Sequence, residues 1–186
     1  AGAGSSWRYK DSQTGLNFSR SEGLAIASLR LFESGVLSQS GLDDPLRVDA
    51  ASLQALTPEI LAKEFQVSQS NQLLGLKDRA KLLNRLGDTL LKQKHIFEAE
   101  GTFRPGNLFD YLTRSQVTGV LEARDILIAV LQGMGEIWPD GSWIDNVAIG
   151  DAGYHEVVKR SDITDGIVPF HKLSQWMSYS LIEPLQ

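Results

Sequence analysis

The chain has no cysteine and little histidine. Its 186 residues contain no Cys and three His, which are His95, His155 and His171. Disulfide bonds, thiolate metal sites and a cysteine nucleophile are therefore excluded, and a histidine-rich metal site is not expected. The lack of thiols fits a reducing compartment, so we expect a cytoplasmic protein that holds neither a metal nor another cofactor.

The chain also lacks a long apolar run and a cluster of basic residues. No segment approaches the roughly 20 apolar residues that a bilayer span needs, and none resembles a signal peptide. The formal net charge is −5 and the Lys and Arg residues are scattered, whereas proteins that bind nucleic acid gather cations to neutralise phosphates. We expect a soluble protein whose partner is neither a membrane nor a nucleic acid polymer.

Familiar catalytic motifs are missing as well. The sequence contains no P-loop, no nucleophile elbow, no zinc-protease helix motif and no dinucleotide-binding glycine pattern after a strand. The glycines of GMGEIW, residues 133–138, come at the end of a helical pattern and do not form such a site. The corresponding classes of hydrolase and oxidoreductase therefore have no support.

What the chain does have is enough apolar sequence for one core. Apolar residues make up 42% and charged residues 22% of the composition, and this length favours a single domain over residues 1–186. Nothing in the sequence indicates an oligomeric state. Because the first residue is not Met, we expect the chain to be a segment of a longer protein that can carry further site residues.

Caps and apolar periodicity predict an all-α or mostly α fold with long, ordered loops. A lead-in without regular structure comes first, and a polar loop separates the first helix from the short helices that follow. In order, the expected features are an irregular segment at 1–17, a capping box from Ser19 to Glu22 that opens a helix ending at Gly35, a loop at 36–48, a short helix capped by Asp49 and another opened by Thr57-Pro58.

The longest predicted helix covers residues 75–97 and has one broad apolar stripe. Gly87 lies at the centre of this stripe, where it costs about 1 kcal/mol relative to Ala unless another backbone packs close to it. Arg79 also falls on the stripe. Its side chain either packs along its stem and reaches water, or forms a buried pair with a carboxylate or a ligand. The stripe consists of Leu76, Ala80, Leu82, Leu83, Leu86, Leu90 and Leu91.

Later segments predict three more helices. Asn107 and Asp110 can cap a helix over 108–115, and the apolar segment 122–138 predicts a central buried helix that ends at the turn signal WPDG. The alternation of apolar and polar residues in 141–168 is too weak to predict a strand. The last helix is expected to enter after Val168-Pro169 and to stop at Pro184.

The last helix carries the most unusual set of side chains. Its expected core face holds Phe170, Leu173, Met177 and Leu181, and two polar arcs beside that face hold His171, Gln175 and Tyr179, and Lys172, Trp176, Tyr179 and Glu183. Side chains at these spacings meet on one face, so they could converge on a small polar ligand. The alternative is a partly solvated helix flank in which Trp and Tyr serve packing.

Several other polar residues have both a structural and a functional interpretation. Asp110 and Glu22 are either helix caps or catalytic groups. Arg104 and Asn107 form either a plain turn or a site for an anion or a hydroxyl group. Asp151 and His155 are loop residues, and loops hold functional groups more often than their share.

Seven segments resemble a fungal and bacterial uracil-catabolism family long known only as a domain of unknown function. Members of that family are longer, and an Asp usually precedes AGAG, so a candidate acid would lie just outside this chain. The segments are AGAGSSWRY, RSEGLAIASLRLF, RVDAASLQALT, QVSQSNQLLGLKDRAKLLNRLG, RPGNLFDYL, GEIWPDG and GIVPFHKLSQWMSYSLIEPL.

A more distant resemblance is to the queuosine-salvage N-glycosidase family, whose all-helical fold is related to DNA glycosylases. It rests on LTPEILAKEF, LLGLKDRAKLLNRLGDTLL, the helix at 122–138 and the closing pattern L-[ST]-x-[FW]-x-x-Y. Leu173, Trp176 and Tyr179 match this pattern. The Asp that precedes the Tyr in that family and the Arg that follows it are Ser178 and Ser180 here.

Together the resemblances imply a hydrolase of an N-ribosidic bond in a ribosylated urea, a nucleoside or a nucleotide. His171 would be the acid or base, and the carboxylate would come from Glu183, Asp151, Asp110 or the upstream Asp. The other implied roles are sugar or urea binding by Gln175 and Tyr179, a pocket wall of Trp176 or Trp138, a 5′-phosphate site at Arg104 and Asn107, and substrate contacts from Arg79 and Glu22. Because the Asp before Tyr179 is lost, a non-catalytic ligand-binding or regulatory protein of the same pathway is the alternative.

Overall fold

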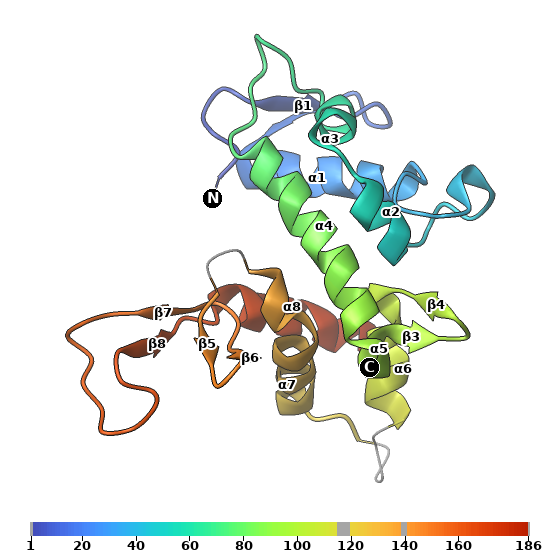
Figure 1. The fold of residues 1–186 in the computed structure, drawn as a ribbon. Helices are drawn as coiled ribbons and strands as arrows, with labels where there is room; N and C mark the ends of the chain where they lie inside the picture. The colour runs from blue at the N-terminus through green and yellow to red at the C-terminus, as the bar shows by residue number, and fades with distance from the viewer. Residues whose placement is uncertain (1, 115–119, 139–140, 186) are drawn as a thin grey trace. The chain divides into compact units, whose positions relative to one another are not determined.

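The computed structural model describes residues 2–114, 120–138 and 141–185, and it shows a mostly α protein, as expected (Figure 1). The chain divides into two compact units, residues 1–87 and 88–186. The expectation of a single domain over the whole chain stays a prediction. Among the described residues, no helix combines the length and the apolar character that a membrane span requires.

The first unit consists of one β-hairpin and a set of helices. Strand β1 pairs with β2 in antiparallel fashion, with Tyr9 opposite Phe18. In chain order the elements are β1 (Arg8–Lys10), β2 (Asn17–Ser19), α1 (Arg20–Glu33), the 3-10 helix η1 (Gly41–Asp43), α2 (Ala50–Ala55), α3 (Pro58–Glu64) and α4 (Leu76–Lys92), whose last turns belong to the second unit.

The second unit continues with short helices and three further hairpins, β3-β4, β5-β6 and β7-β8. Its elements are α5 (Lys94–Phe97), β3 (Glu98–Ala99), β4 (Thr102–Phe103), η2 (Pro105–Asn107), α6 (Leu108–Arg114), α7 (Ala123–Met134), η3 (Gly135–Ile137), β5 (Trp143–Ile144), β6 (Val147–Ala148), β7 (Ala152–Tyr154), β8 (Ile167–Pro169), α8 (Lys172–Ile182) and η4 (Glu183–Leu185). The predicted single helix over 75–97 is therefore divided at Gln93 into α4 and α5.

The segment at the start of the chain is not irregular throughout, contrary to the sequence-based expectation, because it contains strand β1. Trp7 is fully buried, and its indole N–H donates to the Phe65 carbonyl at 3.0 Å. Gly23 of α1 makes room for it, because a Cβ at that position would lie 2.8 Å from the Trp7 ring. The Gly- and Ser-rich composition around Trp7 gave no sign that this residue is part of the core of the first unit.

The predicted caps of the first unit are confirmed in one case of three. The Thr57 hydroxyl accepts from Ile60 N at 3.2 Å, with Pro58 at the first helical position, as predicted. Ser19 and Asp49 stand at the N-cap positions of α1 and α2, but neither side chain makes the cap hydrogen bond. The capping box of Ser19 and Glu22 is therefore not formed, and Glu22 is exposed.

A buried aspartate joins the hairpin loop of the first unit to α1. The Asp11 side chain is 1% exposed and accepts from Arg30 Nε at 2.7 Å and Nη2 at 3.1 Å. The Thr14 hydroxyl donates to the same carboxylate at 2.7 Å. The hydrogen bonds from Arg30 and Thr14 hold the pKa of Asp11 well below its ordinary value.

Two expectations about the helices of the second unit are wrong. Helix α7 buries one face and not its whole circumference, since Ile128 is exposed. Helix α8 packs on α7 and buries Ser174 and Ser178, whereas Phe170 and Leu173, placed on the expected core face, are exposed. Phe170 comes before the helix, so helical spacing does not apply to it, and the face that packs on α7 is the one that holds the small side chains of Ser174 and Ser178. The turn signal after Trp138 includes positions 139 and 140, which lie outside the described residues.

Gly87, at the centre of the apolar stripe of α4, has a close backbone neighbour, which is the second of the two cases that the sequence left open. A Cβ on Gly87 would lie 2.7 Å from the Ala50 carbonyl oxygen and 2.9 Å from Gln54 Cγ. We predict that Gly87→Ala lowers the free energy of unfolding by about 1–3 kcal/mol, because overpacking outweighs the gain in helix propensity. Chemical denaturation measures this change.

Gly106→Ala is the matched control, because a Cβ there would meet no atom within 4 Å. Its free energy of unfolding should change by less than about 1 kcal/mol. An unchanged or raised stability of Gly87→Ala would show that α2 does not pack against this position.

The Asp11 ion pair predicts a pH dependence of stability. Because the pKa of Asp11 is lowered by folding, its contribution is complete above the unfolded-state pKa of about 4 and is lost as the pH falls below that value. The melting temperature of the native protein should therefore fall more steeply than that of Asp11→Asn between about pH 5 and about pH 2, the range around and below the unfolded-state pKa. Asp43→Asn, at an exposed site, should keep the native pH profile, and parallel profiles for all three proteins would contradict the prediction.

Candidate functional site

The β7-β8 hairpin brings together two candidate residues that lie 20 positions apart. Ala152 pairs with Pro169 and Tyr154 with Ile167, so the residues just outside this register, Asp151 and Phe170, come side by side. The carbonyl oxygen of Asp151 accepts from the backbone N–H groups of Phe170 and His171, both at 3.2 Å. The hairpin register thus places Asp151 at the start of α8.

The Asp151 carboxylate organises this helix start. It accepts from the Ser174 hydroxyl at 2.9 Å and from Leu173 N at 3.3 Å, and it lies 3.1 Å from His171 Nδ1. Burial raises the pKa of Asp151, but the hydrogen bonds from Ser174, His171 and the backbone outweigh burial and keep this pKa below its ordinary value. Asp151 is therefore an ionised acceptor beside the imidazole.

His171 is fixed both by its backbone and by its ring. Its φ of 44° lies in the left-handed region, which costs a non-glycine residue on the order of 1–2 kcal/mol. Asp151 accepts from the Nδ1 side of the ring, so the neutral tautomer carries its proton on Nδ1 and leaves the lone pair on Nε2. Among the described residues, no group is hydrogen-bonded to Nε2, which leaves this atom for an external partner.

His171 lines a hollow of about 470 Å³, which we call the His171 hollow. Its wall comes from the end of α7, the β5-β6 hairpin and the residue between α4 and α5. The lining residues are Gln93, Leu131, Gln132, Gly135, Glu136, Trp143, Asn146, Val147, Ala148, Ile149 and His171. The hollow thus combines an oriented histidine, a carboxylate, three side-chain amides and an aromatic wall, the kind of lining that small-molecule sites have.

Glu136 is the residue that the sequence analysis missed. Its carboxylate accepts from Lys92 Nζ at 2.9 Å and from Gln93 Nε2 at 3.5 Å. The signal was present in the sequence, because Glu136 is the one acidic residue in an otherwise apolar helix end, GMGEIW. Glu136 directly follows the second of the two glycines of that segment, Gly133 and Gly135, which do not form a nucleotide site.

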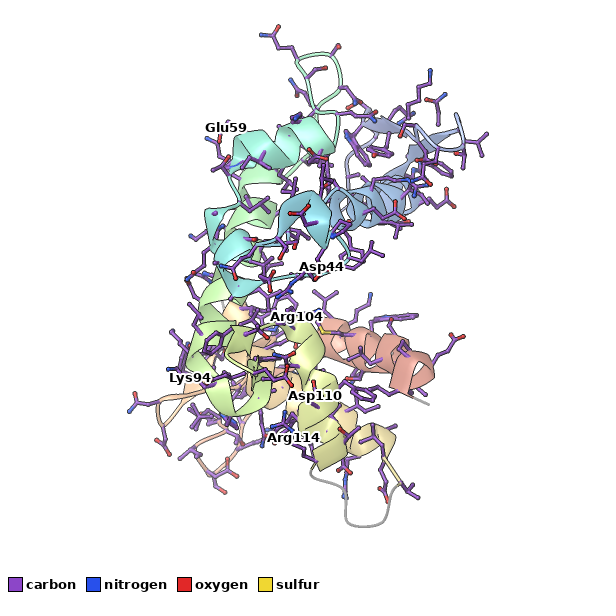
Figure 2. The ribbon with its side chains drawn as sticks, turned by 90° about the vertical axis from the view of Figure 1, so that its right-hand side faces the viewer. Asp44, Glu59, Lys94, Arg104, Asp110 and Arg114 are labelled. Atoms are coloured by element: carbon purple, nitrogen blue, oxygen red, sulfur yellow. The ribbon has the colours of Figure 1, made fainter. Side chains whose placement is uncertain are left out.

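A second hollow, which we call the Arg104 hollow, lies around α5, α6 and the β3-β4 hairpin, and Figure 2 labels four of its charged residues. Its volume is about 690 Å³. The lining residues are Lys94, His95, Glu98, Ala99, Glu100, Thr102, Arg104, Asn107, Asp110 and Arg114. The candidates Arg104, Asn107 and Asp110 are thus brought together, at a hollow whose lining does not include His171.

Asn107 has a structural role that differs from the predicted cap. Its side chain is buried, and its amide donates to the carbonyl oxygens of Phe97 at 2.8 Å and Thr102 at 3.1 Å. These bonds tie the β3-β4 hairpin to the start of α6. The amide is therefore occupied, whereas the buried Nε of Arg104 has no hydrogen-bond partner among the described residues.

His171 is the one member of the two polar arcs that lines either hollow. Gln175, Trp176, Tyr179 and Glu183 are exposed, and the rings of Trp176 and Tyr179 meet edge to face with centroids 6.4 Å apart. The substrate-binding role of Gln175, Trp176 and Tyr179 and the catalytic role of Glu183 stay predictions. The same holds for Trp138, Glu22 and Arg79, of which Arg79 is half-buried and donates to the carbonyl oxygens of Leu74 and Gly2 at 3.4 and 3.5 Å.

Two curated relatives match the whole chain. Uracil catabolism protein 4 of Lachancea kluyveri is 41% identical over 196 residues, which cover 100% of this chain and 44% of that protein. Protein urg3 of Schizosaccharomyces pombe is 40% identical over 190 residues, which cover 100% of this chain and 42% of that protein. The chain therefore spans less than half the length of these relatives, and no solved structure matches it.

A family model agrees with the resemblance to the uracil-catabolism family that seven segments of the sequence show. The model, described as "Protein of unknown function (DUF1688)", matches residues 1–186. The recognition of a uracil-catabolism family once known only as a domain of unknown function is thereby confirmed. Because the match covers the full length, this chain belongs to the DUF1688 family.

Proposed function

We propose that the chain carries the hydrolytic site of a uracil-catabolism protein, which cleaves an N-ribosidic bond in a ribosylated urea, nucleoside or nucleotide. The observation that supports this proposal most is the Asp151-His171 pair at the edge of a hollow that also contains Glu136. The name of the Lachancea relative, uracil catabolism protein 4, supports the pathway. The glycosylase-like helical fold implied by the second resemblance stays a prediction.

The proposed chemistry uses one proton donor and one carboxylate. His171, as the imidazolium stabilised by Asp151, gives its Nε2 proton to the departing nitrogen as the bond to the anomeric carbon breaks. The positive charge that develops on the sugar is stabilised by the Glu136 carboxylate, which also takes a proton from the attacking water. The water oxygen becomes the new hydroxyl on the anomeric carbon, so atoms and charge balance.

The lining amides suit a urea or pyrimidine group. Such groups carry N–H donors and carbonyl acceptors side by side, and the amide side chains of Gln93, Gln132 and Asn146 offer both kinds of group to the hollow. Of the carboxylates expected from the sequence, Asp151 is bonded to His171. Asp110 lines the Arg104 hollow and Glu183 is exposed on η4, so Glu136 takes the carboxylate role in this proposal.

The proposal predicts hydrolysis that depends on His171 and Glu136. The protein is incubated with ribosylurea, its phosphate, uridine and uridine monophosphate, and free ribose or ribose phosphate is measured. One substrate should release sugar, and His171→Asn or Glu136→Gln should each lower kcat by about 10²–10⁴-fold.

The matched control is His155→Asn, since His155 is exposed and does not line the His171 hollow. It should keep native activity. No sugar release, together with a substrate-dependent rise in melting temperature that His171→Asn abolishes, would contradict hydrolysis and favour the non-catalytic, ligand-binding alternative.

Asp151 predicts a different kinetic effect, because it acts on the substrate through His171. Asp151→Asn keeps the size of the side chain but removes the negative charge that stabilises the imidazolium donor, so kcat should fall by about 10²-fold or more while KM changes little. Asp162→Asn, in the loop between β7 and β8, should leave both constants unchanged. A native kcat for Asp151→Asn would remove Asp151 from the mechanism.

A further inference from the structure

Arg104 presents an unsatisfied cation to the Arg104 hollow. Its backbone is fixed on both sides, because its N–H donates to the Phe97 carbonyl and its own carbonyl accepts from Asn107 N, each at 3.2 Å. Its Nε is buried and has no acceptor among the described residues. A buried cationic donor without a partner is costly, and an anion held in the hollow beside this guanidinium would offset that cost through its charge.

Two more cations line the same hollow. Lys94 Nζ lies 5.9 Å from the centroid of the Phe103 ring, and Arg114 ends α6. In the described part of the chain, no carboxylate lies within ion-pair distance of Lys94, Arg104 or Arg114. Figure 2 shows these three residues and Asp110 in the region of α5 and α6.

The hollow also contains carboxylates, which restrict the kind of anion that it can take. Glu98, Glu100 and Asp110 line it together with the three cations, so the formal charges of these side chains cancel. Carboxylates repel a bare anion but accept hydrogen bonds from hydroxyl groups. The lining therefore fits a molecule that has an anionic group at one end and several hydroxyl groups beside it.

We propose that the Arg104 hollow binds a sugar phosphate. The phosphate accepts from the guanidinium of Arg104, whose planar fork suits phosphate oxygens, with Lys94 and Arg114 as further cations. The sugar hydroxyls donate to Asp110 and the neighbouring glutamates. This site goes beyond the proposed hydrolysis and does not rest on it, because its lining residues and those of the His171 hollow are different.

Titration calorimetry with ribose 5-phosphate, ribose and inorganic phosphate tests the site. Ribose 5-phosphate should bind more tightly than either of the other two, and Arg104→Gln should weaken it about tenfold or more. Asp110→Asn should weaken ribose 5-phosphate several-fold but should not weaken inorganic phosphate. Arg124→Gln is the control, since Arg124 is exposed on α7 and does not line the hollow, and it should bind as the native protein does.

Arg104→Lys keeps the charge, so it tests the guanidinium if Arg104→Gln does not fold, and it should also weaken binding. The proposal is overturned if the folded native protein does not bind ribose 5-phosphate, or if both Arg104 variants bind it as tightly as the native protein. It is also overturned if inorganic phosphate binds equally well and Asp110→Asn has no effect. Because the titration measures binding without turnover, its failure would leave the proposed hydrolysis at His171 untouched.

Discussion

The interactions of Asp151 hold the candidate active site together. Its carbonyl accepts from the first N–H groups after β8, and its carboxylate accepts from Ser174, Leu173 N and the imidazole of His171. A largely buried carboxylate is stable only when its oxygens are bonded in this way. The hairpin register, the start of α8 and the orientation of the imidazole therefore all depend on hydrogen bonds to the same residue, Asp151. A change to one of these features is expected to disturb the other two.

The first unit uses buried aspartates in the same way. Asp11 binds Arg30 of α1, and Asp49 accepts from Arg47 Nη2 at 2.6 Å and from Gln39 N at 2.8 Å. In both cases one carboxylate fixes a loop to the helix beside it. Such bonds are strong because the donor is charged or the acceptor is ionised. These two loops can therefore hold one conformation without much apolar sequence of their own.

The sequence predicted some features that a local pattern shows and missed most of those that depend on distant contacts. Thr57 caps α3 as expected, whereas Ser19 and Asp49 make no cap hydrogen bond. The hairpins were missed because strands of two or three residues are too short to show an alternating pattern. The hydrogen bond from Trp7 to Phe65 and the hydrogen bonds that Glu136 accepts from Lys92 and Gln93 likewise join segments that no local pattern relates.

The burial of Ser178 restricts which side chains this position of α8 can hold. The Ser178 hydroxyl donates to the Ser174 carbonyl at 2.9 Å on the buried face of α8. An aspartate at this position would lose its hydration and turn a carboxylate toward a carbonyl oxygen. Such a replacement therefore requires a compensating cation or a wider spacing of α7 and α8, and a single substitution is not enough.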